Sequence, residues 1–345
     1  MNTTAELRPM RNYTIDLVKF LASFGIIAIH TELFRDVNET LYFFAVQIVA
    51  RLSVPFFAVC SGFYAAAAVT RKQSGPSVQK TRYWKQWSSL IVLYLVWTVL
   101  YLLYSIPAWM KIDWTAKAAV ADYCYATLFS GSYYHLWYLL SLIYAWPLYY
   151  LCRRFLSTKA ALPVAALLWM IEVWLYAYSL FFPGVSFPLF AIIQKVPALR
   201  DAVFRILPLL LLGGMIRDRS QEMRRGVLYA GLLVSIVLLI VEAAILNHFG
   251  QDKLSYLIMT FPTAFFLFST LISAKALRMH RLRSLGAIST IVYCVHPMLS
   301  DYLRTKELNS VLAFVVTTAV SSAAAVVCIS IKERKKHQQI VRQTE

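Results

Sequence analysis

The chain has 345 residues, of which 59% are hydrophobic and only 15% are charged, and its mean hydropathy is +0.60. A soluble domain carries about 25% charged residues, so this composition excludes an ordinary soluble protein and indicates repeated membrane spans. The net charge of +17 would favour nucleic acid as a partner of a soluble protein, but in a membrane protein basic residues report topology first.

Apolar stretches of about 17 to 25 residues predict an all-α polytopic membrane helix bundle with about ten transmembrane helices. The sixth stretch is short, and the ninth contains His296 and Pro297. In chain order the predicted spans are 14–34, 41–66, 84–106, 135–155, 160–181, 201–216, 226–247, 255–273, 285–301 and 309–331. We therefore expect a cytoplasmic N-terminal segment 1–13, a transmembrane domain 14–331 and a basic cytoplasmic tail 332–345.

Lysine and arginine are concentrated in alternate loops between these spans, including the segments before the first span and after the last. The positive-inside rule then predicts that both termini are cytoplasmic and that the number of spans is even. Because the charge is explained by topology, we expect no nucleic acid partner. Asp16 and Lys19 interrupt the first apolar run, and no small-x-small site follows before His30, so we expect an uncleaved first span.

The cysteines do not indicate a metal site or a disulfide framework. Five are present, without paired spacing, and most fall inside predicted spans. The prediction is therefore no bound metal.

A polar stripe runs along the first predicted span. At about 100° per residue, Asp16, Lys19, Ser23 and His30 share one helix face, and Lys19 lies about 16 Å from His30 along the axis. Ionisable groups facing hydrocarbon cost several kcal/mol, so this face should turn toward protein or water. Two simpler interpretations stay open, since Asp16 suits a first helical turn and Lys19 can extend to the lipid headgroups.

The second predicted span carries a deeply placed cation. Arg51 lies about 15 Å into it, which makes contact with either membrane surface difficult, so we expect it to face a cavity or an acidic partner. Pro55 would kink the helix beside it. Further along, Ser61 and Gly62 permit close helix approach, and packing is the favoured interpretation for both.

Three more titratable residues should lie with His30 near the outer membrane face: His135 begins the fourth span, Glu242 lies about 24 Å along the seventh, and His296 lies in the outer part of the ninth. A carboxylate within an apolar helix needs a partner or a proton, which makes Glu242 the strongest of the three. His135 and Trp137 could instead belong to an interfacial aromatic belt.

The ordered set of motifs resembles the membrane acyltransferase-3 family over about residues 10 to 331. Within the family the chain looks closest to the membrane domain of membrane-bound serine racemases and to stand-alone O-acetyltransferases, partly through His135–Leu139 and Glu242. The other residues that carry the resemblance are Arg11, Ile15, Asp16 and Leu17, the Lys19 to His30 spacing, Arg51 with Val54–Phe57 and Ser61–Phe63, and Gly286, Ser289, Tyr293 and His296.

The resemblance implies an acyltransferase of the bacterial plasma (inner) membrane that moves an acyl group, usually acetyl from cytoplasmic acetyl-CoA, to an acceptor at the outer face. The expected partners are the lipid bilayer and an extracytoplasmic glycan, wall polymer or lipid-linked sugar. Many relatives have arginine at the position of Lys19, and lysine loses the bidentate fork. No racemase or SGNH-type domain follows the spans, so we expect acceptor chemistry that needs either to reside elsewhere.

The working hypothesis gives His30 the role of general base, or of a transient acyl carrier, with Arg51 stabilising negative charge and Glu242 orienting a partner or holding substrate. The predicted substrate contacts are His135, Trp137, Tyr293 and His296. The predicted coenzyme A contacts are Lys19, Lys80, Arg82 and Lys85 for the phosphates, with Ser61 and Gly62 beside the pantetheine arm. Positive-inside topology explains the basic loop cluster equally well.

A transporter of serine-like amino acids or small metabolites is the alternative function, because the same buried polar residues could line a substrate or proton path. Internal repeats would favour it, and none is convincing in this sequence. A membrane scaffold without catalysis is a third hypothesis, which leaves the aligned polar residues unexplained.

Overall fold

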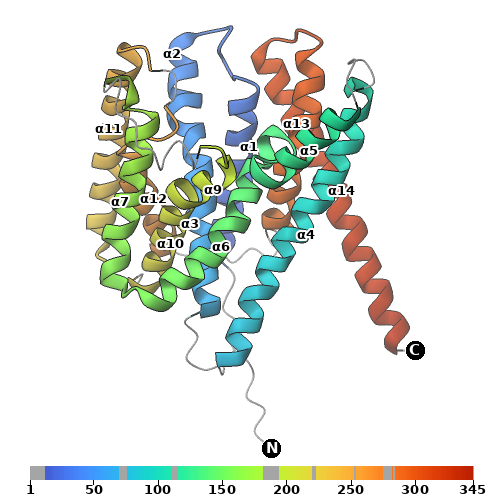
Figure 1. The fold of residues 1–345 in the computed structure, drawn as a ribbon, viewed down its shortest axis with the longest axis horizontal. Coiled ribbons are helices and arrows are strands. Elements are labelled where there is room, and N and C mark those ends of the chain that lie inside the picture. The colour runs from blue at the N-terminus through green and yellow to red at the C-terminus, as the bar shows by residue number, and fades with distance from the viewer. Residues whose placement is uncertain are drawn as a thin grey trace, which may run out of the picture.

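The computed structural model describes residues 12–69, 76–109, 116–181, 194–219, 223–251, 254–274, 282 and 284–344. Within these ranges the regular elements are helices and no strand occurs, which confirms the all-α prediction. The helices stand side by side in one bundle, with α7, α11 and α12 on one flank and α4, α5, α13 and α14 on the other (Figure 1).

Each predicted span coincides with a helical segment. The first half of the chain contains α1 (Tyr13–His30), α2 (Glu39–Tyr42), η1 (Phe43–Val49), η2 (Ala50–Leu52), α3 (Ser53–Val69), α4 (Pro76–Trp109), α5 (Ala116–Phe129), η3 (Tyr134–Leu136) and α6 (Trp137–Phe155). The second half contains α7 (Thr158–Tyr176), η4 (Ser179–Phe181), α9 (Pro197–Asp201), η5 (Ala202–Ile206), α10 (Leu207–Arg219), α11 (Arg225–His248), α12 (Thr260–Ser273), α13 (Leu285–Arg304) and α14 (Ser310–Thr344).

Among the described residues, six helical segments are both long and apolar enough to cross a membrane. They are Tyr13–His30, Glu39–Ala67, Lys80–Pro107, Thr158–Tyr176, Arg225–His248 and Ser310–Lys335. Helix α12 is apolar but shorter. The protein is thus a multi-span membrane helix bundle, while the count of ten and the cytoplasmic placement of both termini stay predictions.

Several helix boundaries differ from those expected. The sixth predicted span is part of a continuous helical stretch, because α9, η5 and α10 follow one another without a break. Helix α13 passes through Pro297, and α14 continues to Thr344, so the helix does not end at the predicted domain boundary of 331. Residues 1–11 of the predicted N-terminal segment lie outside the described residues.

The centre of the bundle is formed where α3 and α10 touch. Every residue of α10 from Leu207 to Ile216 is buried, which is typical of a helix surrounded by others. A Cβ atom on Gly62 would lie 2.1 Å from the carbonyl oxygen of Leu210, and one on Gly213 would lie 2.0 Å from that of Val59. The two backbones approach each other through glycine, as small residues allow in membrane helix pairs.

The second span is irregular just before α3. Residues Phe43–Val49 form a π-helix and Ala50–Leu52 a 3₁₀ turn, so the helical repeat changes twice around Arg51. Such local changes of helical repeat are frequent at functional sites because they redirect side chains. The irregular segment includes Arg51 and ends before Pro55, which lies within the regular helix α3. The irregularity beside Arg51 therefore does not begin at the proline.

Candidate functional site

A cavity of about 380 Å³ opens between the helices close to the end of α1 that carries His30, and we call it the central cavity. This volume lies within the range of about 300–1,000 Å³ of small-molecule sites. Its lining comes from α1, η2, α3, η3, α6, α7, α9, η5, α13 and the loop before α12. The residues are Ile26, Ile29, His30, Arg51, Val54, Pro55, His135, Trp137, Tyr138, Tyr176, Asp201, Arg205, Ser255, Tyr256 and Tyr293.

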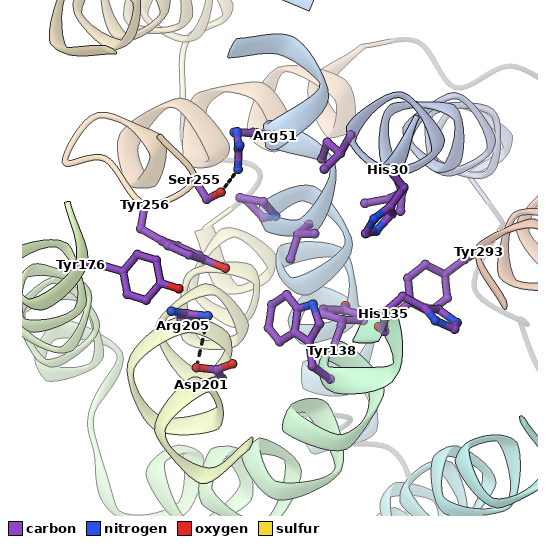
Figure 2. Close-up of a pocket in the computed structure, with 15 residues that line it drawn as sticks. His30, Arg51, His135, Tyr138, Tyr176, Asp201, Arg205, Ser255, Tyr256 and Tyr293 are labelled. Atoms are coloured by element: carbon purple, nitrogen blue, oxygen red, sulfur yellow. Dashed lines mark hydrogen bonds and ion pairs between the residues drawn. The ribbon is translucent and has the colours of Figure 1, made fainter. Parts of the chain in front are cut away.

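Three histidines gather at one side of the central cavity. The ring of His30 lies 5.2 Å from that of His296, and the ring of His135 lies 5.7 Å from that of His296, measured between centroids. Tyr293 stands beside them and donates its hydroxyl to the backbone carbonyl of His135. Figure 2 shows His30, His135 and Tyr293 on the same side of the cavity. The structure therefore brings these four predicted site residues together from α1, η3 and α13.

The rings of His135 and His296 are buried but not fully hydrogen-bonded. His135 is 1% exposed, and neither of its ring nitrogens has a hydrogen-bond partner among the described residues. His296 is 0% exposed and places Nδ1 2.8 Å from the carbonyl oxygen of Tyr293, while its Nε2 has no partner in the part of the chain that the structure describes. Because a carbonyl only accepts, the Nδ1 of a neutral His296 carries the proton and Nε2 is an acceptor. Buried polar atoms of this kind call for a ligand or ordered water.

Arg51 enters the cavity from η2. Its Nε donates to Gln47 Oε1 at 2.5 Å, and its Nη1 donates to the hydroxyl of Ser255 in the loop before α12. Figure 2 shows this second contact at the edge of the cavity. The predicted cavity position of this cation is confirmed, and its contacts hold the guanidinium at a fixed place on the wall.

The opposite side of the cavity is built around Arg205, which the sequence analysis did not identify. Arg205 is 5% exposed, donates Nε to Glu172 Oε1 at 2.5 Å and places Nη1 3.2 Å from Asp201 Oδ1. Its guanidinium carbon lies 4.1 Å from the ring centroid of Tyr256 and 4.5 Å from that of Tyr176. Ion pairs and cation–π contacts thus surround one buried cation.

Glu242 lies apart from the central cavity, in a separate groove between η4, α11 and the start of α12. Its Oε1 accepts from the hydroxyl of Tyr178 at 2.8 Å and from the backbone N–H of Ile258 at 2.8 Å, and its Oε2 accepts from the N–H of Met259 at 2.9 Å. Glu242 holds the chain just before α12, so its position does not fit the predicted role beside His30.

The residues predicted to contact coenzyme A also lie outside the central cavity. Lys80, Arg82 and Lys85 are exposed near the beginning of α4, and Lys19 is half-buried in the first half of α1. Ser61 donates its hydroxyl to the carbonyl oxygen of Phe57 at 2.9 Å, as expected for a packed helix residue. Gly62 faces the backbone of Leu210, which leaves no room for a pantetheine arm at that face.

The bundle and its polar cavity define a membrane protein with a buried site of titratable residues. Residues 12–332 match the model of the acyltransferase domain that defines the acyltransferase-3 family. The match covers nearly the whole chain, and this protein belongs to that family.

Curated relatives carry racemase names. An amino-acid racemase of Enterococcus faecalis is 27% identical over 329 residues, which cover 91% of this chain and 44% of the relative. A serine/alanine racemase of Enterococcus gallinarum is 28% identical over 313 residues, which cover 84% of this chain and 41% of the relative. The chain therefore spans less than half the length of these relatives. No solved structure matches the chain significantly.

Proposed function

We propose that this protein is a membrane O-acyltransferase of the bacterial plasma membrane that moves an acetyl group from cytoplasmic acetyl-CoA to a hydroxyl of an extracytoplasmic glycan, wall polymer or lipid-linked sugar. Membership of the acyltransferase-3 family supports the reaction class. The observation that carries the proposal is the position of His30, which lines a polar cavity together with Arg51 and with His135, whose imidazole has no hydrogen-bond partner among the described residues.

In this reaction His30 is the general base. It removes the proton from the acceptor hydroxyl while the hydroxyl oxygen forms a bond to the acyl carbonyl carbon. The carbon–sulfur bond then breaks, and the thiolate of coenzyme A takes up the proton held by His30. Negative charge develops on the carbonyl oxygen, so a cation and a buried donor on the cavity wall, Arg51 and His135, lower the barrier.

The donor has to approach from the end of the bundle opposite His30. The exposed basic residues at the beginning of α4, Lys80, Arg82 and Lys85, offer charge for its phosphates, and Lys19 lies along α1 toward His30. The tight contact of α3 with α10 excludes a route past Gly62. The position of Lys19 favours a path that runs along α1 toward His30.

The test uses membranes from cells that express the full chain, supplied with acetyl-CoA labelled in the acetyl group. We expect label in the saccharide fraction of the envelope, and a loss of about 10²- to 10⁴-fold with His30→Ala, the range for removal of a general base. His248→Ala is the matched control, because His248 is exposed at the end of α11 and does not line the cavity. Full transfer by the His30 variant would contradict the proposal.

Amino-acid transport is the second candidate, because the racemase relatives act by name on amino acids. The central cavity presents the guanidinium groups of Arg51 and Arg205 together with the carboxylate of Asp201, and a zwitterion needs charges of both signs. Uptake of labelled serine into proteoliposomes that contain no coenzyme A would favour transport. Absence of uptake, together with His30-dependent transfer in membranes, would exclude it.

A further inference from the structure

A second pocket also has His30 in its lining. It has a volume of about 440 Å³ and combines the end of α1 and the turn after it with the end of α13 and the beginning of α14. We call it the α14 pocket. Its lining residues are His30, Thr31, Glu32, Arg35, Asp36, Ser300, Arg304, Leu308, Ser310 and Ala313. His30 is the residue that the lining of this pocket shares with that of the central cavity.

The frame of the α14 pocket is fixed by contacts between segments far apart in the chain. Asp36 accepts hydrogen bonds from the backbone N–H of Ser310 at 3.0 Å and from its hydroxyl, and the N–H of Phe34 lies 3.0 Å from that hydroxyl oxygen. Arg304 Nη2 donates to the carbonyl oxygen of His30 at 3.1 Å. The turn after α1 is therefore joined to α13 and α14, and the pocket keeps its shape beside His30.

The lining of the α14 pocket is polar and carries charges of both signs. Arg35 pairs with Glu32 at 2.7 Å, and Arg304 lies 3.9 Å from Asp301. Hydroxyl groups, guanidinium donors and carboxylate acceptors stand around one apolar wall formed by Leu308 and Ala313. Such a lining suits a neutral molecule with many hydroxyl groups and apolar C–H faces, and it suits a strongly anionic one less well.

We propose that the α14 pocket is the acceptor subsite and that it binds a saccharide unit whose reacting hydroxyl points to His30. This inference rests on the proposed function, since it places the acceptor on one side of His30 and the acyl carbonyl in the central cavity on the other. The hydroxyl gives its proton to the His30 imidazole, its oxygen bonds to the acyl carbon, and coenzyme A leaves with that proton. Because His30 lines both pockets, donor and acceptor enter from opposite ends of the bundle in this proposal.

The test fills the α14 pocket without touching the central cavity. Ala313 lines the pocket and is 8% exposed, whereas Leu312, the preceding residue of α14, is 46% exposed and does not line it. Ala313→Trp is therefore compared with Leu312→Trp. Ser300→Leu fills the same pocket from α13 and serves as a second variant if the tryptophan prevents folding.

Two measurements separate the inference from the proposed function. The first is transfer of label from acetyl-CoA to the envelope saccharide fraction, and the second is the thermal stabilisation of the purified protein by acetyl-CoA. We expect Ala313→Trp and Ser300→Leu to lower transfer by about 100-fold, as a displaced reacting group does, while acetyl-CoA still stabilises both proteins. We expect Leu312→Trp to transfer like the wild type.

Transfer by both pocket variants at the wild-type level would overturn the inference and leave the proposed function standing. Loss of the stabilisation by acetyl-CoA in well-folded pocket variants would also overturn it, because the pocket would then serve the donor. If neither the wild type nor Leu312→Trp transfers label, the proposed function fails, and the inference falls with it.

Discussion

The two sides of the central cavity differ in how their polar atoms are satisfied. On one side, Arg205 uses Nε and Nη1 for carboxylates and presents its face to two tyrosine rings, while its Nη2 and the Oε2 of Glu172 have no hydrogen-bond partner among the described residues. On the other side, the imidazole of His135 has no hydrogen-bond partner at either nitrogen among those residues. A buried polar group that is paired supports the fold, whereas one left unpaired costs stability and is retained where a ligand supplies the partner.

Glu242, which lies outside the central cavity, is a third case in which the hydrogen bonds of a polar side chain can be compared. It is a carboxylate in a predicted span, which is the usual sign of function in a membrane protein. Both of its oxygens nevertheless accept hydrogen bonds, two of the three from backbone N–H groups. A charged residue within a span therefore indicates a site only when the protein does not already satisfy its hydrogen-bonding capacity.

The largest expected effect is a loss of folding stability in Arg205→Ala, which removes the cation of the paired cluster. Removing Arg205 leaves the buried charge of Glu172 uncompensated, while Asp201 keeps its ion pair with Arg200 at 2.7 Å, and breaking a buried pair in this way costs about 3–5 kcal/mol. Unfolding titrations in mixed detergent micelles should show this loss, with the exposed Arg225→Ala as control. An Arg205→Ala protein as stable as the control would mean that the cluster serves the ligand and contributes little to the fold.

A smaller loss of stability is expected from Glu242→Leu. The change leaves the N–H groups of Ile258 and Met259 without their acceptor, and an unsatisfied group costs about 1–3 kcal/mol. The same unfolding titration measures it, and Leu233→Ile is the control, because Leu233 is exposed on the same helix and does not line the groove of Glu242. Transfer activity per folded molecule should stay at the wild-type level, and its abolition would restore Glu242 to the catalytic set.

The sequence predicted more of the cavity around the histidines and Arg51 than of the cluster around Arg205. His30, Arg51, His135, Trp137 and Tyr293 were each expected near a site, and all line the central cavity. These positions could be predicted because helical periodicity and depth along a span follow directly from residue spacing. The positions of the helices followed from apolar length in the same way.

The paired side depended on contacts that spacing does not contain. Asp201 and Arg205 are four residues apart at the start of a short span, and Glu172 lies in an apolar helix, so each had a local signal. The contact of Glu172 with Arg205 joins two separate helices. A single sequence, without tertiary contacts, does not show that these helices come together. The partners of Glu242 could not be predicted either, because a pattern of side chains does not show which backbone N–H groups a carboxylate contacts.

His135→Phe tests the other side of the central cavity, where the buried imidazole should matter for transfer and not for stability. Because the ring nitrogens of His135 have no hydrogen-bond partner within the described ranges, phenylalanine should leave the stability unchanged or raise it. Acetyl transfer should fall about tenfold, the equivalent of one lost hydrogen bond to substrate. Transfer assays and unfolding titrations on the same preparation check both halves. A clear loss of stability would show that the imidazole is paired, through water, in the protein without ligand.

The smallest effect is expected at the α14 pocket, where the hydrogen-bonded carboxylate of Asp36 is exposed. Hydrogen bonds from Ser310 lower the pKa of Asp36 below its usual value of 3.8. A carboxyl whose folded pKa is depressed adds stability above the unfolded pKa and loses it as pH falls through the folded pKa. Asp36→Asn should therefore unfold at a slightly lower temperature than the wild type at pH 7, and the difference should shrink below about pH 4. Thermal unfolding of both proteins across this pH range measures the shift. A difference that stays constant with pH would mean that the contact acts through shape and hydrogen-bond number, without a contribution from the charge of Asp36.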